Sequence, residues 1–138
     1  MADEPAVAVA TELQSAGVAT MGSDLYTSFV REPTEGIPVK SLFVFASDGF
    51  LPSPYMRGIT NRVSFQRIFV EVYARSEFYE FEIGRAFAKS AYRALHLARL
   101  PDYVWCKALR SEPRYIGQDK RENHEWNFRL ELGIKETY

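Results

Sequence analysis

The most informative part of the sequence is PRYIGQDKRENHEWNFRLELGI, which runs from Pro113 to Ile134. In its second half every second side chain is apolar, at Trp126, Phe128, Leu130, Leu132 and Ile134. The positions between them are polar, at Glu125, Asn127, Arg129 and Glu131. Alternation with a period of two residues is typical of a strand that packs one face against a core. The sequence therefore predicts a long terminal strand that is half buried.

The first half of this stretch predicts a hairpin that projects from the domain over residues 113–124. Gly117 can adopt the positive φ that a turn requires, and residues 118–123 are too polar to be buried. The segment carries no catalytic residue types, so we expect it to contact a neighbouring subunit or partner. The candidate interface residues in the hairpin are Tyr115, Ile116, Gln118, Lys120 and Arg121.

The composition predicts a single domain that is made in the cytoplasm. A chain of 138 residues suits one hydrophobic core. With 17 basic and 18 acidic residues, the net charge of −1 offers no general attraction for nucleic acid or an anionic membrane. No apolar run approaches the ~20 residues of a membrane span, and no export signal is expected at the acidic N-terminus. The single cysteine excludes an internal disulfide.

The remaining pattern predicts two helices and further strands. A first helix is expected over residues 1–17, since acids and a proline precede its apolar positions and a glycine follows them. A long helix is expected between Ser76 and Pro101, with Ser76 as its N-cap. Its predicted buried stripe consists of Phe81, Gly84, Ala88, Ala91, Leu95 and Ala98. Other strands are expected over Leu25–Val30, Val39–Ala46, Val63–Arg75 and Tyr103–Arg110.

The resulting order, α-β-β-β-α-β-β, predicts an α+β fold in a single domain. We expect a mostly antiparallel sheet with the helices packed on one face. The order of the strands within the sheet does not follow from this pattern.

The segment from Phe50 to Arg62 is apolar for a loop, although two prolines and a glycine preclude regular structure through most of it. One interpretation is a loop that covers its own core. The other is an adhesive loop that a partner buries, with Tyr55 or Met56 as the anchor. Its candidate interface residues are Phe50, Leu51, Pro52, Pro54, Tyr55 and Met56.

The sequence predicts no catalytic residue, no metal site and no cofactor. His96 and His124 lack a partner at the three- or four-residue spacing of common metal sites. Cys106 falls on the buried side of its strand, where a thiol is inert. The sequence contains none of the motifs GxSxG, GxxxxGK[ST] and GxGxxG.

An RNA-binding sheet is an alternative, because Phe69 and Tyr73 lie between Arg67 and Arg75 and could stack bases. A second packing layer would account for these aromatic side chains equally well. The Gly/aromatic pattern of common RNA-binding sheets is absent.

The order of the segments resembles a known family. LYTSFV is followed by PVKSLFVFASDG, then by the strand FQRIFVEVYAR, a long helix, and finally SEPRYIGQDKRENHEWNFRLEL. This order resembles the minor capsid and tail terminator (tail completion) proteins of long-tailed bacteriophages. The resemblance covers about Leu25 to Glu131, and its specificity lies in the order of the segments. The chain departs from the family at residues 118–122, where a glycine-bearing turn is common.

The resemblance implies a structural virion protein at the head–tail junction. Such a protein forms a homo-oligomeric ring, six-fold by analogy with the tail tube. The ring caps the tube protein, ends its polymerisation and provides the docking surface for the head-side connector or stopper protein. Genomic DNA passes through the lumen without specific binding, so we expect a lining that is acidic or neutral. The lumen-facing candidates are Glu32, Glu35 and Asp48.

Two alternatives to a tail terminator stay open at this point. One is another component of the head–tail neck, such as an adaptor or a stopper. The other is a small enzyme or RNA-binding α+β domain unrelated to phages.

Overall fold

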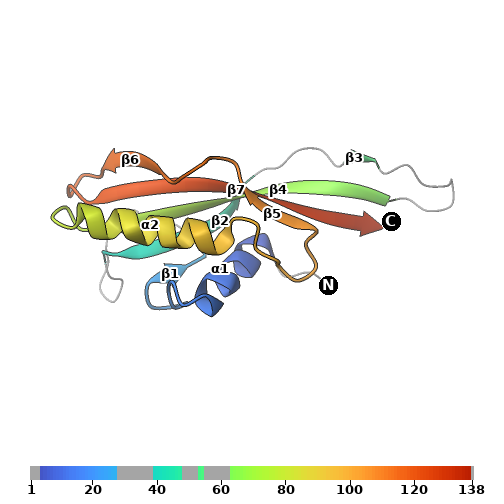
Figure 1. Cartoon of the computed structure of the whole chain (residues 1–138), viewed down its shortest axis with the longest axis horizontal. Coiled ribbons are helices and arrows are strands. Elements are labelled where there is room, and N and C mark those ends of the chain that lie inside the picture. The colour runs from blue at the N-terminus through green and yellow to red at the C-terminus, as the bar shows by residue number, and fades with distance from the viewer. Residues whose placement is uncertain (1–3, 28–38, 48–52, 55–62, 138) are drawn as a thin grey trace.

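A computed structural model describes residues 4–27, 39–47, 53–54 and 63–137 of the chain (Figure 1). The described residues form two helices and seven strands. In chain order these are α1 (Pro5–Ser15), β1 (Leu25–Tyr26), β2 (Ser41–Ser47), β3 (Ser53–Pro54), β4 (Val63–Ser76), α2 (Phe81–Leu95), β5 (Trp105–Ala108), β6 (Arg114–Gln118) and β7 (His124–Thr137).

The strands form one sheet in the order β1-β2-β4-β7-β5, with β3 paired to β4 and β6 paired to β7. The pairing of β1 with β2 is parallel, and the other pairings are antiparallel. At its centre β4 pairs with β7 along the whole length of both strands, from Val63↔Thr137 to Ser76↔His124. At one end these two strands extend past both helices as a ribbon (Figure 1). The predicted α+β class with a mostly antiparallel sheet is confirmed.

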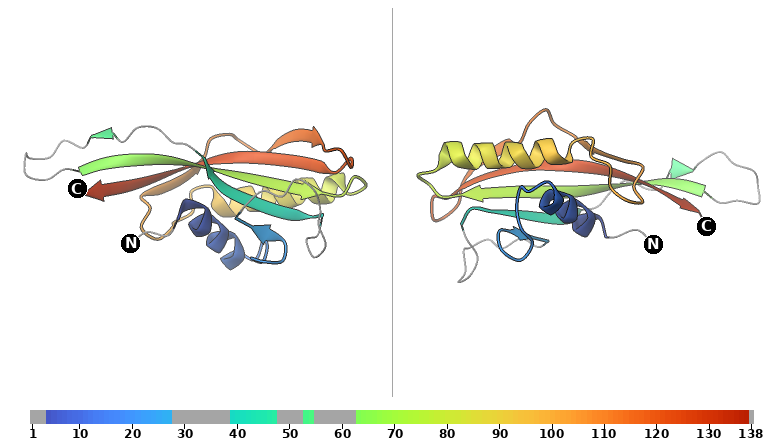
Figure 2. Two further views of the ribbon diagram at one scale, coloured as in Figure 1. Left: turned by 180° about the vertical axis from the view of Figure 1, so that it is seen from behind. Right: turned by 60° about the horizontal axis from the view of Figure 1, so that its bottom comes forward.

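Both helices pack on the same face of the sheet (Figure 2). The core between the helices and the sheet contains side chains with almost no exposed surface, among them Val9, Leu13, Leu42, Val44, Val70, Val72, Ala88, Ala91, Leu95, Phe128, Leu130 and Leu132. The apolar positions of β4 and β7 point into this core, as their alternation predicts. Burying each large aliphatic side chain contributes about 1.5–3 kcal/mol, so this face holds the domain together.

Gly84 allows α2 to approach the sheet closely. A Cβ atom at this position would lie 2.1 Å from the Ser76 hydroxyl oxygen and 2.7 Å from the Trp126 ring. Both distances are far below van der Waals contact, so only glycine fits here. The crossing of α2 over β4 and β7 therefore depends on this residue.

The start of α2 differs from the prediction. Ser76 is not its N-cap, because β4 continues pairing with β7 up to Ser76↔His124 and holds Ser76 in an extended conformation. The helix begins at Phe81, and Glu80 precedes it without a side-chain capping bond. The predicted buried stripe is also corrected, because Phe81 is exposed and Phe87 takes a buried position.

The hairpin is formed by β6 and the start of β7. Residues 114–118, predicted as part of a turn, form strand β6 and pair with residues 124–127. Gly117 has a φ of 131° but lies at a β-bulge opposite Glu125, so it bends the strand and not the turn. Asp119 shapes the turn, since its Oδ1 accepts hydrogen bonds from the backbone N–H groups of Arg121 and Asn123.

Candidate functional site

Several of the predicted contact residues lie outside the described part of the chain. These are Phe50, Leu51, Pro52, Tyr55 and Met56 in the apolar loop, and Glu32, Glu35 and Asp48 as lumen candidates. Pro54 is described, and it lies in β3, where it pairs with Ser64 of β4. The roles of these residues stay predictions.

The predicted hairpin residues fall into two groups. Tyr115 and Ile116 are exposed apolar side chains on β6. Gln118, Lys120 and Arg121 are exposed polar side chains at the end of β6 and in the turn. The structure brings Tyr115 next to further exposed aromatic side chains.

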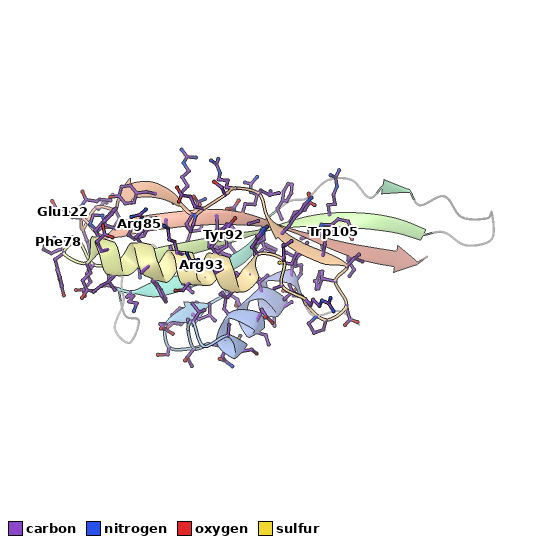
Figure 3. All side chains as sticks on the ribbon, in the orientation of Figure 1. Phe78, Arg85, Tyr92, Arg93, Trp105 and Glu122 are labelled. Carbon is purple, nitrogen blue, oxygen red and sulfur yellow. The ribbon has the colours of Figure 1, made fainter. Side chains whose placement is uncertain are left out.

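Those aromatic side chains come from the N-terminal end of α2 and from the loop before it. The Phe81 and Tyr115 rings meet edge to face, with centroids 5.4 Å apart. Phe78 and Tyr79 form another edge-to-face pair at 5.2 Å, and they are 56% and 68% exposed. Figure 3 shows the Phe78 side chain pointing away from the body at one end of the molecule. We call the surface formed by Phe78, Tyr79, Phe81 and Tyr115 the end patch.

The sequence prediction missed Phe78 and Tyr79 because it placed them within the first turns of the helix. The available signal was a pair of adjacent aromatic residues between Glu77 and Glu80, outside any apolar stripe. Large aromatic side chains that remain exposed on a folded domain are typical of contact surfaces.

His124 connects the three segments that carry the end patch. Its Nε2 lies 2.8 Å from the backbone oxygen of Phe78, and its Nδ1 lies 2.8 Å from the Tyr115 hydroxyl. A carbonyl oxygen only accepts, so Nε2 donates to Phe78, and in the neutral imidazole Nδ1 then accepts from the Tyr115 hydroxyl. His124 is thus a structural residue of β7. Among the described residues, no group of three histidine, cysteine or acidic side chains could hold a metal ion.

A second exposed apolar surface lies in the connection between α2 and β5. Leu97 is 70% exposed and Val104 is 57% exposed. They border an open groove of about 470 Å³ that is also lined by Ala98, Arg99, Tyr103, Trp105 and Cys106. We call Leu97, Val104 and this groove the loop patch.

Cys106 is a buried thiol with a structural role. It is 1% exposed, and its Sγ–H donates a hydrogen bond to the backbone oxygen of Leu95 at 3.3 Å. Burial raises the pKa of the Cys106 thiol to about 12, so the thiol stays protonated at neutral pH. The predicted burial and low reactivity of this residue agree with this environment.

The face of the sheet opposite the helices carries the residues of the proposed RNA platform, and they are engaged within the chain. The Tyr73 ring stacks on Phe45 with centroids 5.5 Å apart, and the Arg129 guanidinium lies 5.3 Å from the Phe69 centroid. Arg75 is only 2% exposed, and its Nε donates to the backbone oxygen of Val39. These contacts occupy the surfaces on which bases would stack.

Buried carboxylates on the same face are paired with basic or N–H groups. Glu71 accepts a hydrogen bond from Arg129, and Glu131 accepts one from the Trp105 indole at 2.9 Å. Lys107 lies 3.4 Å from Glu131. This arrangement is typical of charges held for structure, because each buried carboxylate has a partner that offsets its desolvation.

No helix in the described ranges is long and apolar enough to cross a membrane. No family model matches the chain, and no curated protein matches it. Among solved structures, the chain is similar to a chain in the virion of a native gene transfer agent (GTA) particle. The TM-score is 0.58 at 16% sequence identity, over 96% of this chain and 95% of that one. The two chains share their fold from end to end.

Proposed function

We propose that this chain is a structural virion protein of a phage-like particle and acts as its tail terminator. Copies of the chain form a ring, a hexamer by analogy with the tail tube, at the head–tail junction. The ring caps the tail tube, ends its polymerisation and provides the surface to which the head-side connector docks. The observation that carries this proposal is the end-to-end likeness of fold to a chain of a GTA virion, at 96% and 95% coverage.

The exposed surface supports an assembling subunit and not an enzyme. The end patch and the loop patch present large apolar side chains to solvent, which a protein without partners rarely does. The histidines of the described chain bond to backbone groups or to Tyr115, and its thiol is buried. A ring that closes by repetition needs two different patches on each subunit, and this chain has two.

The charge of the chain supports a passage for DNA without tight binding. At a net charge of −1 the chain lacks the excess of cations that drives nonspecific binding to phosphates. We propose that the genome passes through the ring lumen, with Glu32, Glu35 and Asp48 as lining residues. The contact residues of the apolar loop, with Tyr55 or Met56 as anchor, belong to the same proposal.

Another neck component, an adaptor or a stopper, is the second candidate. The likeness to a virion chain supports this role as well, because neck proteins also form rings. The two roles differ in their neighbours: a terminator contacts the tail tube, whereas an adaptor lies on the portal side.

Electron microscopy of the particle whose genome encodes this chain tests the proposal. A small cleavable or gold-binding tag on the chain is expected to appear as one ring at the head-proximal end of the tail tube. The matched control is the same tag on the tail tube protein, which must appear along the entire tail. A tagged chain found on the portal side would favour an adaptor, and its absence from particles would contradict a virion role.

A further inference from the structure

The end patch and the loop patch lie at opposite ends of α2. Phe78 precedes this helix and Leu97 follows it, and the 15 residues between Phe81 and Leu95 span about 22 Å. A surface at one end therefore cannot cover the surface at the other end within the same molecule. Each patch is available to a different neighbour.

The charges beside Phe78 and Tyr79 and in the groove are opposite in sign. Glu77 and Glu80 flank Phe78 and Tyr79 in the sequence, whereas Glu82 pairs with Arg85, which lies beside Phe81 and Tyr115. Arg99 lines the groove of the loop patch. Opposite charges across an interface fix its orientation and suppress like-to-like contacts. Pairing of Phe78 and Tyr79 with the same segment of another copy would oppose Glu77 and Glu80 to the same two glutamates, whereas pairing with the groove brings them near Arg99.

The backbone at Leu97 supports a role for its exposed side chain. Leu97 follows the C-cap of α2 with a φ of 63°, in the left-handed region where glycine is usual. Its N–H donates to the backbone oxygen of Cys106 at 2.9 Å, which holds this conformation. A leucine here strains the backbone and gains little burial in the monomer, because its side chain is 70% exposed.

We propose that the end patch of one copy docks on the loop patch of the next copy. In this contact Phe78 and Tyr79 enter the groove between Leu97 and Val104, and Glu77 and Glu80 face Arg99. The contact is head to tail, so it leaves one patch free at each end of a growing chain of subunits, and a ring forms when the rotation between neighbouring copies closes. This inference rests on the proposed function, and it names the surfaces that would join the ring.

Mixing two assembly variants tests the pairing. The end variant carries Phe78→Ser and Tyr79→Ser, and the loop variant carries Leu97→Gly and Val104→Asp. Each is expected to be monomeric by native mass spectrometry under conditions in which the wild type forms rings. In an equimolar mixture, the intact end patch of the loop variant can bind the intact loop patch of the end variant. The two remaining patches are both altered, so the mixture is expected to form dimers and nothing larger. The control Met21→Ser removes a side chain that is 38% exposed outside both patches, and it should leave rings intact.

Misfolding is separated from lost contact by the single variant Leu97→Gly. Glycine suits the left-handed backbone, so this variant is expected to melt at the same or a higher temperature and still to assemble more weakly. A lower melting temperature together with unchanged assembly would contradict a role for Leu97 in the contact.

Cysteine cross-linking gives a second, independent measurement. A variant with both Tyr79→Cys and Val104→Cys should yield a ladder of linked subunits on oxidation, whereas either single variant should remain monomeric. A bond within one copy is excluded, because a disulfide needs Cα atoms within about 7 Å. Linked dimers of a single variant would show that a patch meets itself and would overturn the proposal.

The failure of this inference is distinguishable from the failure of the proposed function. Wild-type-like rings in the end variant or the loop variant would overturn the pairing and leave the ring proposal intact. A wild-type chain that forms no ring, either purified or in isolated tails, would overturn both.

Discussion

At the scale of single residues, the chain uses its chemically reactive groups for structure. Cys106 donates to the Leu95 backbone, and His124 connects Phe78 with Tyr115. The burial of Cys106 follows from alternation along its strand, so it could be predicted from the sequence. The role of His124 could not, because its partners lie 9 and 46 residues away along the chain. Local patterns carry no information about such contacts.

The raised pKa of Cys106 predicts a specific dependence of stability on pH. The folded thiol titrates at about 12, whereas its ordinary value is 9.0. The stabilisation from the folded, protonated thiol is therefore complete below pH 9 and is lost as the pH rises toward 12. At pH 10.5 the wild type should have lost about 2 kcal/mol of unfolding free energy relative to pH 8 through this group.

Urea unfolding of the wild type and of Cys106→Ala at both pH values checks this prediction. The variant lacks the thiol, so its unfolding free energy does not change through this group. The difference in unfolding free energy between the wild type and Cys106→Ala should therefore be about 2 kcal/mol smaller at pH 10.5 than at pH 8. A difference independent of pH would show that Cys106 titrates normally in the folded state.

At the scale of elements, the core between β7 and α2 is the part that the sequence predicts best. The period of two in β7 fixes which side chains face the core, and Leu130 is fully buried there. The start of α2 could not be predicted, because the pairing of Ser76 with His124 overrides a favourable N-cap residue. The pairing of β6 with β7 could not be predicted either, because residues 114–118 are mostly exposed and do not alternate between buried and exposed side chains.

Truncation of one core side chain tests the packing of these elements. Leu130→Ala should lower the free energy of unfolding by about 2–5 kcal/mol, because it removes a buried side chain and leaves a cavity. The matched control is Leu109→Ala, since Leu109 is a leucine that is 43% exposed just after β5. The control should change stability by about 0.5 kcal/mol or less. Equal melting temperatures for Leu130→Ala and the wild type would reject this arrangement.

At the scale of the whole molecule, the described chain is an elongated sheet with its helices on one face (Figure 1). Its exposed apolar surfaces lie at separate places. The sequence predicted a contact device at the hairpin, and Tyr115 and Ile116 of that hairpin are exposed. It did not predict that Phe78 and Tyr79 lie on one surface with Tyr115, because this surface is assembled from a loop, a helix and a strand that are distant in sequence. The loop patch was missed for the same reason, together with the unusual backbone of Leu97.

The length of the tails made without this chain tests the proposed tail-terminator role. Particles should be produced with the gene for this chain removed, with and without the wild-type chain supplied in trans, and the tail tubes measured by negative-stain electron microscopy. For a tail terminator we expect overlong tubes of variable length and heads without tails, with normal length and joining restored by the wild-type chain. Tails of uniform, normal length joined to heads in the absence of the chain would contradict it.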